Sequence, residues 1–304
     1  MKHTKQVTYI LIAMFLLSQI VGLFVLNGYV DKEKSILEGK VIFKDLPFHQ
    51  ERPEIEESTS VFWLVIAVLI GTGIALLLFK YNLHLLWKAW FFIAVWICIT
   101  FATYAFVSET IALFVGLFFA IFKVIKPNFY IHNLGELFVY AGIAVIIVPI
   151  MNIFSGIVML VLISLYDYWA VFKSKHMVSL VKSQEKTKVF AGLLIPYSIK
   201  SKISNKSNQV SDKNVLKTSK NQNATQSDNS EIAILGGGDI AFALLFAGIV
   251  FKYYGFLPSL LIPLFSTIAI SYLLFKGQKG KFYPAMPFIS IGCLVGYGIV
   301  YSMF

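Results

Sequence analysis

Long apolar runs recur along almost the whole chain, and they constrain its fold more than any other feature. Each is long enough to cross a hydrocarbon core of about 30 Å as a helix. In lipid, each run must satisfy its own backbone hydrogen bonds, which makes helix the default. We therefore predict an all-α polytopic membrane protein of about nine transmembrane helices. The expected spans are residues 7–29, 60–79, 85–106, 109–124, 129–149, 152–172, 232–254, 257–275 and 285–304.

Composition supports a membrane protein over a soluble one. Apolar residues make up 58% of the chain, whereas about half is usual in soluble domains. The formal net charge of +10 would suggest nucleic acid for a soluble protein. Here the lysines lie between apolar runs, so we expect a lipid bilayer and no nucleic acid as partner. Cys98 and Cys293 both lie inside apolar runs, which predicts neither a disulfide framework nor a cysteine metal site.

The first apolar run follows Lys2 and Lys5 and has the basic start of a signal peptide. It is longer than the apolar region of such peptides, and a small-x-small cleavage site is missing. We therefore expect residues 7–29 to be retained as the first transmembrane helix.

Two long loops separate the runs. Residues 30–59 carry eight acidic and five basic residues. Residues 173–231 become rich in Ser, Lys, Asn and Gln from about 201 to 230. That tract has too few apolar residues to offset its ordering entropy, so we predict disorder there.

The lysine distribution predicts the orientation. With nine spans, twenty lysines lie on the side of the N-terminus, and six lysine or arginine residues lie on the opposite side. Positive residues favour the cytoplasmic face. We therefore expect a cytoplasmic N-terminus, an external C-terminus and a cytoplasmic loop 173–231.

Two aspartates interrupt neighbouring apolar runs. Asp167 precedes Lys173 by six residues, and Asp239 follows Glu231 by eight. At the helical rise, these offsets place the carboxyl groups about 9 and 12 Å from the flanking charges. Both flanking charges belong to the loop 173–231, so the aspartates should lie at similar depth on antiparallel helices. Charged groups at membrane depth are costly, which makes both residues functional candidates.

Two carboxyl groups in contact cannot both ionise cheaply, so such a pair holds one shared proton. One member can take a proton from water while the other gives a proton to a peptide carbonyl. The pair titrates as a unit, which leaves the acid and the base unassigned. The alternative is that each aspartate binds a serine, tyrosine or lysine within the helix bundle.

Glycine and proline residues that disfavour a regular helix lie near the aspartates or at the start of the last span. Gly236, Gly237 and Gly238 weaken a helix and permit an unwound turn with close backbone approach, although small residues also serve ordinary helix packing. Pro284 and Pro287 should delay a regular helix until after Pro287. The backbone groups freed there can hold an extended peptide.

Three motifs now stand in a recognisable order. Tyr166-Asp167, Gly236-x-Gly238-Asp239 and Pro284-Ala285-Met286 resemble the YD, GxGD and PAL motifs of the presenilin and signal peptide peptidase family. Met286 stands where that family usually has leucine. Residues 175–180 are similar to the archaeal presenilin homologues in particular. The resemblance covers residues 152–304, whereas the first five spans match only in number and hydropathy.

The resemblance implies an intramembrane aspartyl protease that cuts within or at the edge of transmembrane helices of substrate proteins. Asp167 and Asp239 would be the catalytic pair, supported by Tyr166 and the three glycines. Pro284, Ala285 and Met286 would help bind substrate. Neither a cofactor nor a metal is implied.

The spans divide the chain into two halves, and the lysine distribution predicts a location for the site. Residues 1–150 would form a scaffold half with the external loop 30–59. Residues 151–304 would form the catalytic half, with its active site towards the cytoplasmic face of the cell membrane. The predicted orientation resembles presenilin rather than signal peptide peptidase, which implies a preference for substrates with external N-termini.

Other functions remain open at this point. Paired intramembrane acids also relay protons in coupled transporters, although both acids cluster in one half and an inverted repeat is not evident. A prepilin-peptidase-like GxGD protease is a second alternative. A non-catalytic scaffold is the third, and it should tolerate Asp→Ala.

Three further predictions concern residues outside the motifs. Residues 189–197 are apolar but too short to span, so we expect a strand or surface-lying segment that pairs with unwound substrate. Glu109, Glu136 and Glu231 fall near span ends and are expected to face water or headgroups. His84, His132 and His176 show no metal-ligand spacing.

Overall fold

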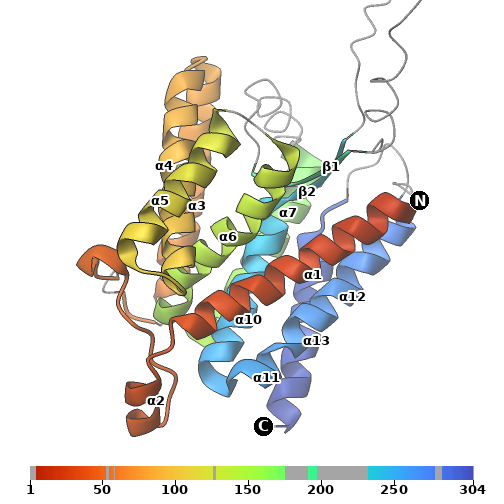
Figure 1. Ribbon diagram of the computed structural model, residues 1–304. Helices are drawn as coiled ribbons and strands as arrows, with labels where there is room; N and C mark the ends of the chain where they lie inside the picture. The colour runs from red at the N-terminus through yellow and green to blue at the C-terminus, as the bar shows by residue number, and fades with distance from the viewer. Residues whose placement is uncertain are drawn as a thin grey trace, which may run out of the picture.

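The computed structural model describes residues 5–52, 55–57, 59–125, 128–174, 191–196, 232–277 and 283–303 (Figure 1). The tract predicted to be disordered, residues 201–230, lies outside the described residues. So does segment 175–180, which carried the resemblance to archaeal homologues.

Helices make up most of the described chain, with one small sheet at one end. The long helices are α1 (Lys5–Gly28), α3 (Ser60–Lys80), α4 (His84–Tyr104), α5 (Glu109–Val124), α6 (Phe129–Ile147), α7 (Ile153–Trp169), α10 (Gly237–Tyr254), α12 (Leu261–Lys276) and α13 (Met286–Met303). The short elements are α2 (Lys32–Glu38), η1 (Pro47–His49), η2 (Val148–Ile150), η3 (Ala170–Ser174), α11 (Phe256–Ser259), and the strands β1 (Gly192–Pro196) and β2 (Ile232–Gly236).

Eight helical segments in the described chain are long and apolar enough to cross a membrane. The prediction of a polytopic helical membrane protein is therefore confirmed. The remaining predicted span corresponds to α5, which has 16 residues. Helix α3 has few buried residues, and most of its apolar side chains are partly or fully exposed, as expected of a helix whose surroundings are lipid.

The seventh predicted span was wrong at its start. Residues 232–236 form β2 rather than the first turn of a helix, and α10 begins only at Gly237. Strand β2 pairs antiparallel with β1, from Gly192 opposite Gly236 to Pro196 opposite Ile232. A short apolar run does not reveal whether it is strand or helix. The strand expected within residues 189–197 is confirmed for residues 192–196.

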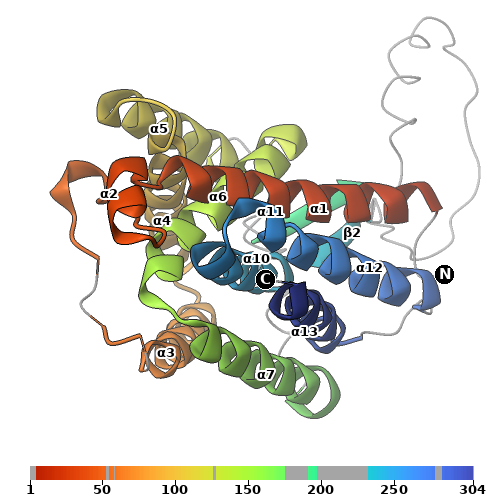
Figure 2. The ribbon, with the colours of Figure 1, turned by 90° about the horizontal axis from the view of Figure 1, so that it is seen from below.

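The sheet lies at the same end of the molecule as the start of α1, which we call the sheet end (Figure 1). Helix α2 and the end of α13 lie at the opposite end, which we call the α2 end. Seen along the bundle, α10 lies among α1, α6, α7, α12 and α13 (Figure 2). Its middle residues are fully buried, so α10 forms the centre of the bundle that carries Asp239.

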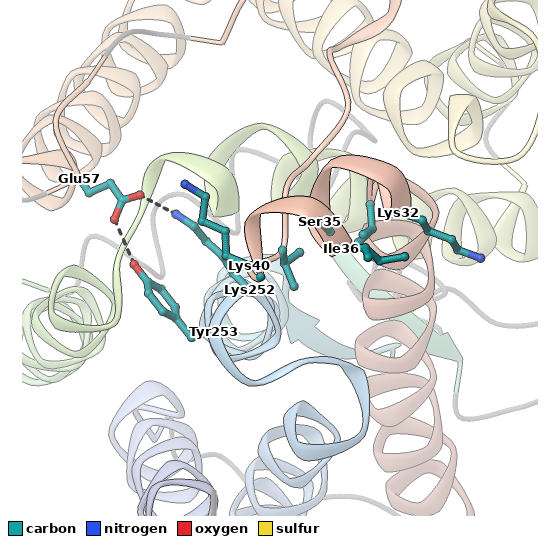
Figure 3. A pocket seen from close by; sticks show the side chains of 10 residues that line it. Lys32, Ser35, Ile36, Lys40, Glu57, Lys252 and Tyr253 are labelled. Carbon is teal, nitrogen blue, oxygen red and sulfur yellow. Dashed lines mark hydrogen bonds and ion pairs between the residues drawn. The ribbon is translucent and has the colours of Figure 1, made fainter.

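A cluster of ionic and hydrogen-bonded contacts at the α2 end, which we call the Glu57 clasp, joins three segments (Figure 3). The Glu57 carboxylate accepts hydrogen bonds from Lys252 Nζ at 2.8 Å and from the Tyr253 hydroxyl at 3.0 Å. The backbone carbonyl of Glu57 accepts a bond from Ser155 Oγ at 2.7 Å. The clasp therefore connects the segment before α3 to α7 and α10. It borders a cavity of about 570 Å³.

Candidate active site

The structure brings the two predicted aspartates to the sheet end on adjacent helices. Asp167 is the third residue from the end of α7, and Asp239 is the third residue of α10. Both are half-buried. Helices α7 and α10 contact each other, so the two carboxyl groups lie at the same end of one helix pair. Neighbouring carboxyl groups are what a proton-sharing pair requires.

Asp167 is held by the start of α13. Its Oδ2 accepts a hydrogen bond from the backbone N–H of Met286 at 3.1 Å. The first N–H groups of a helix have no partner within the helix, and the helix dipole favours a negative group there. The Pro-Ala-Met segment thus orients an aspartate through its backbone, a role that the sequence analysis missed.

The start of α13 also corrects a prediction. The helix begins at Met286, one residue before Pro287, rather than after it. A proline in the first turn is compatible with a helix because its missing N–H would have lacked an intrahelical partner in any case. Pro284 is buried, and Ile289 N donates to Ala285 O at 3.1 Å.

The three glycines form the junction between β2 and α10. A Cβ on Gly237 would lie 2.8 Å from the Tyr140 hydroxyl oxygen and 3.2 Å from the Ala191 carbonyl oxygen. A Cβ on Gly236 would lie 3.1 Å from Asp239 Oδ2. Gly238 is exposed, and its nearest neighbour would be the Phe242 ring at 3.7 Å. The most crowded glycine is therefore Gly237, at the position that the GxGD motif leaves open.

Tyr166 lies on the outer side of α7. Its side chain is 39% exposed, and its ring centroid lies 6.5 Å from that of Trp169 on the same helix. Tyr166 is therefore the neighbour of Asp167 in the sequence only: its side chain lies at the protein surface and not in the interior.

Two buried polar contacts next to the aspartates escaped the sequence analysis. Ser164 Oγ and Ser290 Oγ lie 2.7 Å apart and join α7 to α13. Gln19 Nε2 donates to the carbonyl oxygen of Ile240 at 3.0 Å and joins α1 to α10. A glutamine in the middle of an apolar run was the signal that could have revealed the second contact.

Glu136 corrects another prediction, because it does not face water. Its exposed fraction is 1%, and that of Lys123 is 2%. Lys123 Nζ donates to Glu136 Oε1, which forms a buried ion pair between α5 and α6. Hydropathy located the helix ends but not the rotation of each helix about its axis. Glu109 is half-buried, and its carboxylate accepts a hydrogen bond from Phe48 N at 3.1 Å. Glu231 lies outside the described residues.

Among the described residues, groups of three or more His, Cys, Asp or Glu side chains that could hold a metal ion are absent.

Comparisons with known proteins agree with this arrangement. A family model described as signal-peptide peptidase, presenilin aspartyl protease matches residues 12–304. The motifs alone had indicated the family only for residues 152–304, so the match extends it to the first five predicted spans. A search of curated protein sequences finds no match.

Two solved structures of a presenilin family intramembrane aspartate protease share the fold. The structure in space group C222 has a TM-score of 0.59 and 14% sequence identity, and the match covers 98% of this chain and 99% of that one. The structure in space group P2 has a TM-score of 0.56 and 15% identity, and it covers 97% of both chains. With the family model matching nearly its whole length, this chain belongs to the signal-peptide peptidase and presenilin family of aspartyl proteases.

Proposed function

We propose that this intramembrane aspartyl protease hydrolyses peptide bonds within or at the edge of transmembrane segments, with Asp167 and Asp239 as its catalytic pair. The observation that carries the proposal is the placement of these two carboxyl groups at the same end of two adjacent helices, Asp167 near the end of α7 and Asp239 near the start of α10. Repulsion between neighbouring carboxyl groups allows one of them to stay protonated while the other is ionised.

The pair supplies both proton transfers of the hydrolysis. The ionised carboxylate takes a proton from water, and the water oxygen bonds to the carbonyl carbon of the substrate. The protonated carboxyl group gives its proton to the carbonyl oxygen. Collapse of the resulting gem-diol breaks the C–N bond. The leaving nitrogen takes the proton that the first carboxyl group had received from water, and the second, now ionised, carboxylate takes a proton from a gem-diol hydroxyl. This leaves a carboxylic acid and an amine and restores the pair. The bond from Met286 holds Asp167 in one orientation during these steps.

The edge of β2 that faces away from β1 offers backbone groups to which a substrate segment can bind. Opposed residues in an antiparallel pair alternate between hydrogen-bonded and non-hydrogen-bonded. The N–H and C=O of Leu194 bind Asn133 instead of β2, so Leu194 and Ile234 form a non-hydrogen-bonded pair. The N–H and C=O of Ile234 consequently point away from β1. An unwound substrate segment can add to that edge of β2, which moves the expected pairing from residues 189–197 to β2.

The location follows the lysine distribution. The site lies at the sheet end, beside the predicted cytoplasmic loop 173–231. We place the protein in the cell membrane as a multi-pass protein with its active site towards the cytoplasmic face, and transmembrane helices of other proteins as its substrates.

The test is incubation of the purified protein with a synthetic transmembrane peptide. Wild type should release two product peptides, whereas Asp167→Ala and Asp239→Ala should release none. Equal product from all three proteins would remove the aspartates from the mechanism. Proton flux in liposomes without peptide cleavage would favour the transporter instead.

A further inference from the structure

Strand β1 lies between β2 and the polar face of α6. A two-stranded sheet is marginally stable by itself, so the position of β1 depends on what holds its second edge. Among the described elements, α6 and α1 contact β1 besides β2 and the start of α10. Helix α6 supplies the side-chain hydrogen bonds at that second edge.

Asn133 of α6 binds both backbone groups of one β1 residue. Its Nδ2 donates to the Leu194 carbonyl oxygen at 2.8 Å, and its Oδ1 accepts from the Leu194 N–H at 3.0 Å. One carboxamide thus reproduces the two bonds that a neighbouring strand would make. It fits only one residue of β1 at a time.

His132 makes a similar contact two residues earlier in β1. Its Nε2 lies 2.9 Å from the carbonyl oxygen of Gly192. A carbonyl oxygen only accepts hydrogen bonds, so Nε2 carries the proton and donates. Gly192 and Leu194 share one edge because successive residues of a strand alternate in direction. The two bonds from α6 therefore fix β1 along its length.

The rotation of α6 is fixed in turn by the buried ion pair. Glu136 lies three residues after Asn133 and four after His132, so it is on the same face of the helix. Its bond to Lys123 connects this face to α5. Tyr140 lies one turn further and abuts Gly237. One face of α6 therefore contacts both β1 and the turn that carries Asp239.

The position of β1 determines that of β2. The pairing sets Leu194 opposite Ile234, and Gly237 N donates to Ala191 O at 3.3 Å. A slip of one residue would turn every side chain of a strand to the other face of the sheet. Ile234 precedes Asp239 by five residues, so the register of β1 fixes the substrate edge relative to the catalytic pair.

We propose that Asn133 and His132 are positioning residues that decide which peptide bond of the substrate is cut. They act through the register of β1 and β2. The proposal rests on the proposed function, in which a substrate segment pairs with the edge of β2 that faces away from β1. Loss of a contact that only stabilised the fold would change the amount of product. Loss of a contact that sets the register of β1 and β2 would change which peptide bond is cut, and therefore which products form.

The experiment compares two substitutions at one position with a matched control on the same helix. Asn133→Leu removes both bonds at similar side-chain size. Asn133→Asp keeps the acceptor and replaces the donor by an oxygen, which the Leu194 carbonyl repels. The control is Asn128→Ala, because Asn128 caps the start of α6 through Tyr130 N at 3.1 Å, in an exposed position.

The readout is the mass spectrum of the products from one synthetic transmembrane peptide cut by the full-length purified protein. In Asn133→Leu, the ratio of the main product to secondary products should fall by about thirtyfold, the equivalent of two lost hydrogen bonds. The new cuts should lie two residues away, since that slip keeps the same side chains on each face. Asn133→Asp should shift the products in the same way. Asn128→Ala should keep the wild-type pattern.

Thermal unfolding of each variant separates a register effect from loss of fold. If Asn133→Leu unfolds, Asn133→Asp provides the decisive pattern. A wild-type product pattern from a folded Asn133 variant would overturn the proposal, and so would complete loss of all products from a folded variant. Failure of the wild-type protein to cut the peptide would instead overturn the proposed function, and it would be visible before any variant is used.

Discussion

At the scale of single residues, the backbone does as much for the active site as the side chains do. Asp167 is oriented by the N–H group of Met286, which any residue except proline provides. The Met286 side chain is 3% exposed and packs in the core. The departure from leucine at this position therefore leaves the bond to Asp167 unaffected.

This backbone role predicts that Met286→Pro is more harmful to catalysis than Met286→Ala. Proline fits the first position of a helix but removes the N–H that binds Asp167. A hydrogen bond to a charged group is worth about 1.5–3 kcal/mol, which corresponds to a fall in kcat of about tenfold or more. Met286→Ala should lose packing while keeping the bond. Equal kcat values for the two variants, measured on the same synthetic peptide, would contradict the role.

The glycines before Asp239 should differ in their tolerance of substitution. Gly237→Ala places a Cβ 2.8 Å from the Tyr140 hydroxyl oxygen, whereas Gly238→Ala makes an ordinary contact of 3.7 Å with Phe242. Overpacking costs about 1–3 kcal/mol, so Gly237→Ala should unfold at lower temperature than wild type. Gly238→Ala should unfold at or above the wild-type temperature, because alanine favours helix. The reverse order in thermal unfolding would contradict the assigned contacts.

A site residue could be predicted when its own residue type was unusual for its place in the sequence, but its partners in space could not. Asp167, Asp239 and the glycines stand out because a charge or a glycine run is unusual inside an apolar run. Gln19, Asn133 and the buried Glu136 carry a similar signal, but their partners are distant in the chain. Which side of a helix faces inward is decided by packing, and the apolar runs here have little amphipathic pattern to reveal it.

At the scale of elements, the structure consists of helices whose ends are fixed by local contacts. Asn128 and Asn152 cap α6 and α7 with their side chains, and glycine begins α10. The apolar runs predicted these helices well because length and hydropathy determine a span. Strand β2 was mistaken for helix because its partner β1 lies across a long stretch of sequence.

The Glu57 clasp should stabilise the bundle without affecting the cut. Lys252 donates to Glu57 and also to the backbone carbonyl of Met151 at 3.1 Å. Glu57→Gln should lower stability by about 1 kcal/mol or less, because the pair is partly exposed and screened by water. Lys252→Met should lower the stability further, because the Met151 carbonyl oxygen then loses its hydrogen-bond donor as well. Both variants should give wild-type products, and a changed cut site would show coupling between the two ends.

At the scale of the whole molecule, one bundle combines the two sequence halves. Helix α1 packs against α10 and α12 as well as α6, and Gln19 reaches the residue after Asp239. The N-terminal half therefore contacts the catalytic helices directly. The prediction of a scaffold half from residues 1–150 stays a proposal that this contact supports.

The orientation can be tested with single cysteines at the two ends. Glu33 in α2 and Lys276 at the end of α12 are both exposed. A membrane-impermeant maleimide should label Glu33→Cys in intact cells, but Lys276→Cys only after lysis. A background without Cys98 and Cys293 serves as control. The opposite labelling pattern would reverse the proposed orientation.

The central claim is that Asp167 and Asp239 act as one catalytic unit. The most direct measurement is the single-turnover rate of peptide cleavage by Asp167→Asn, Asp239→Asn and the double variant, with unfolding temperatures as a control for folding. Groups that act as a unit show non-additive losses. The account predicts that each single variant loses as much rate as the double variant. Losses that add in the double variant, or a single variant that still cleaves at the wild-type rate, would contradict it.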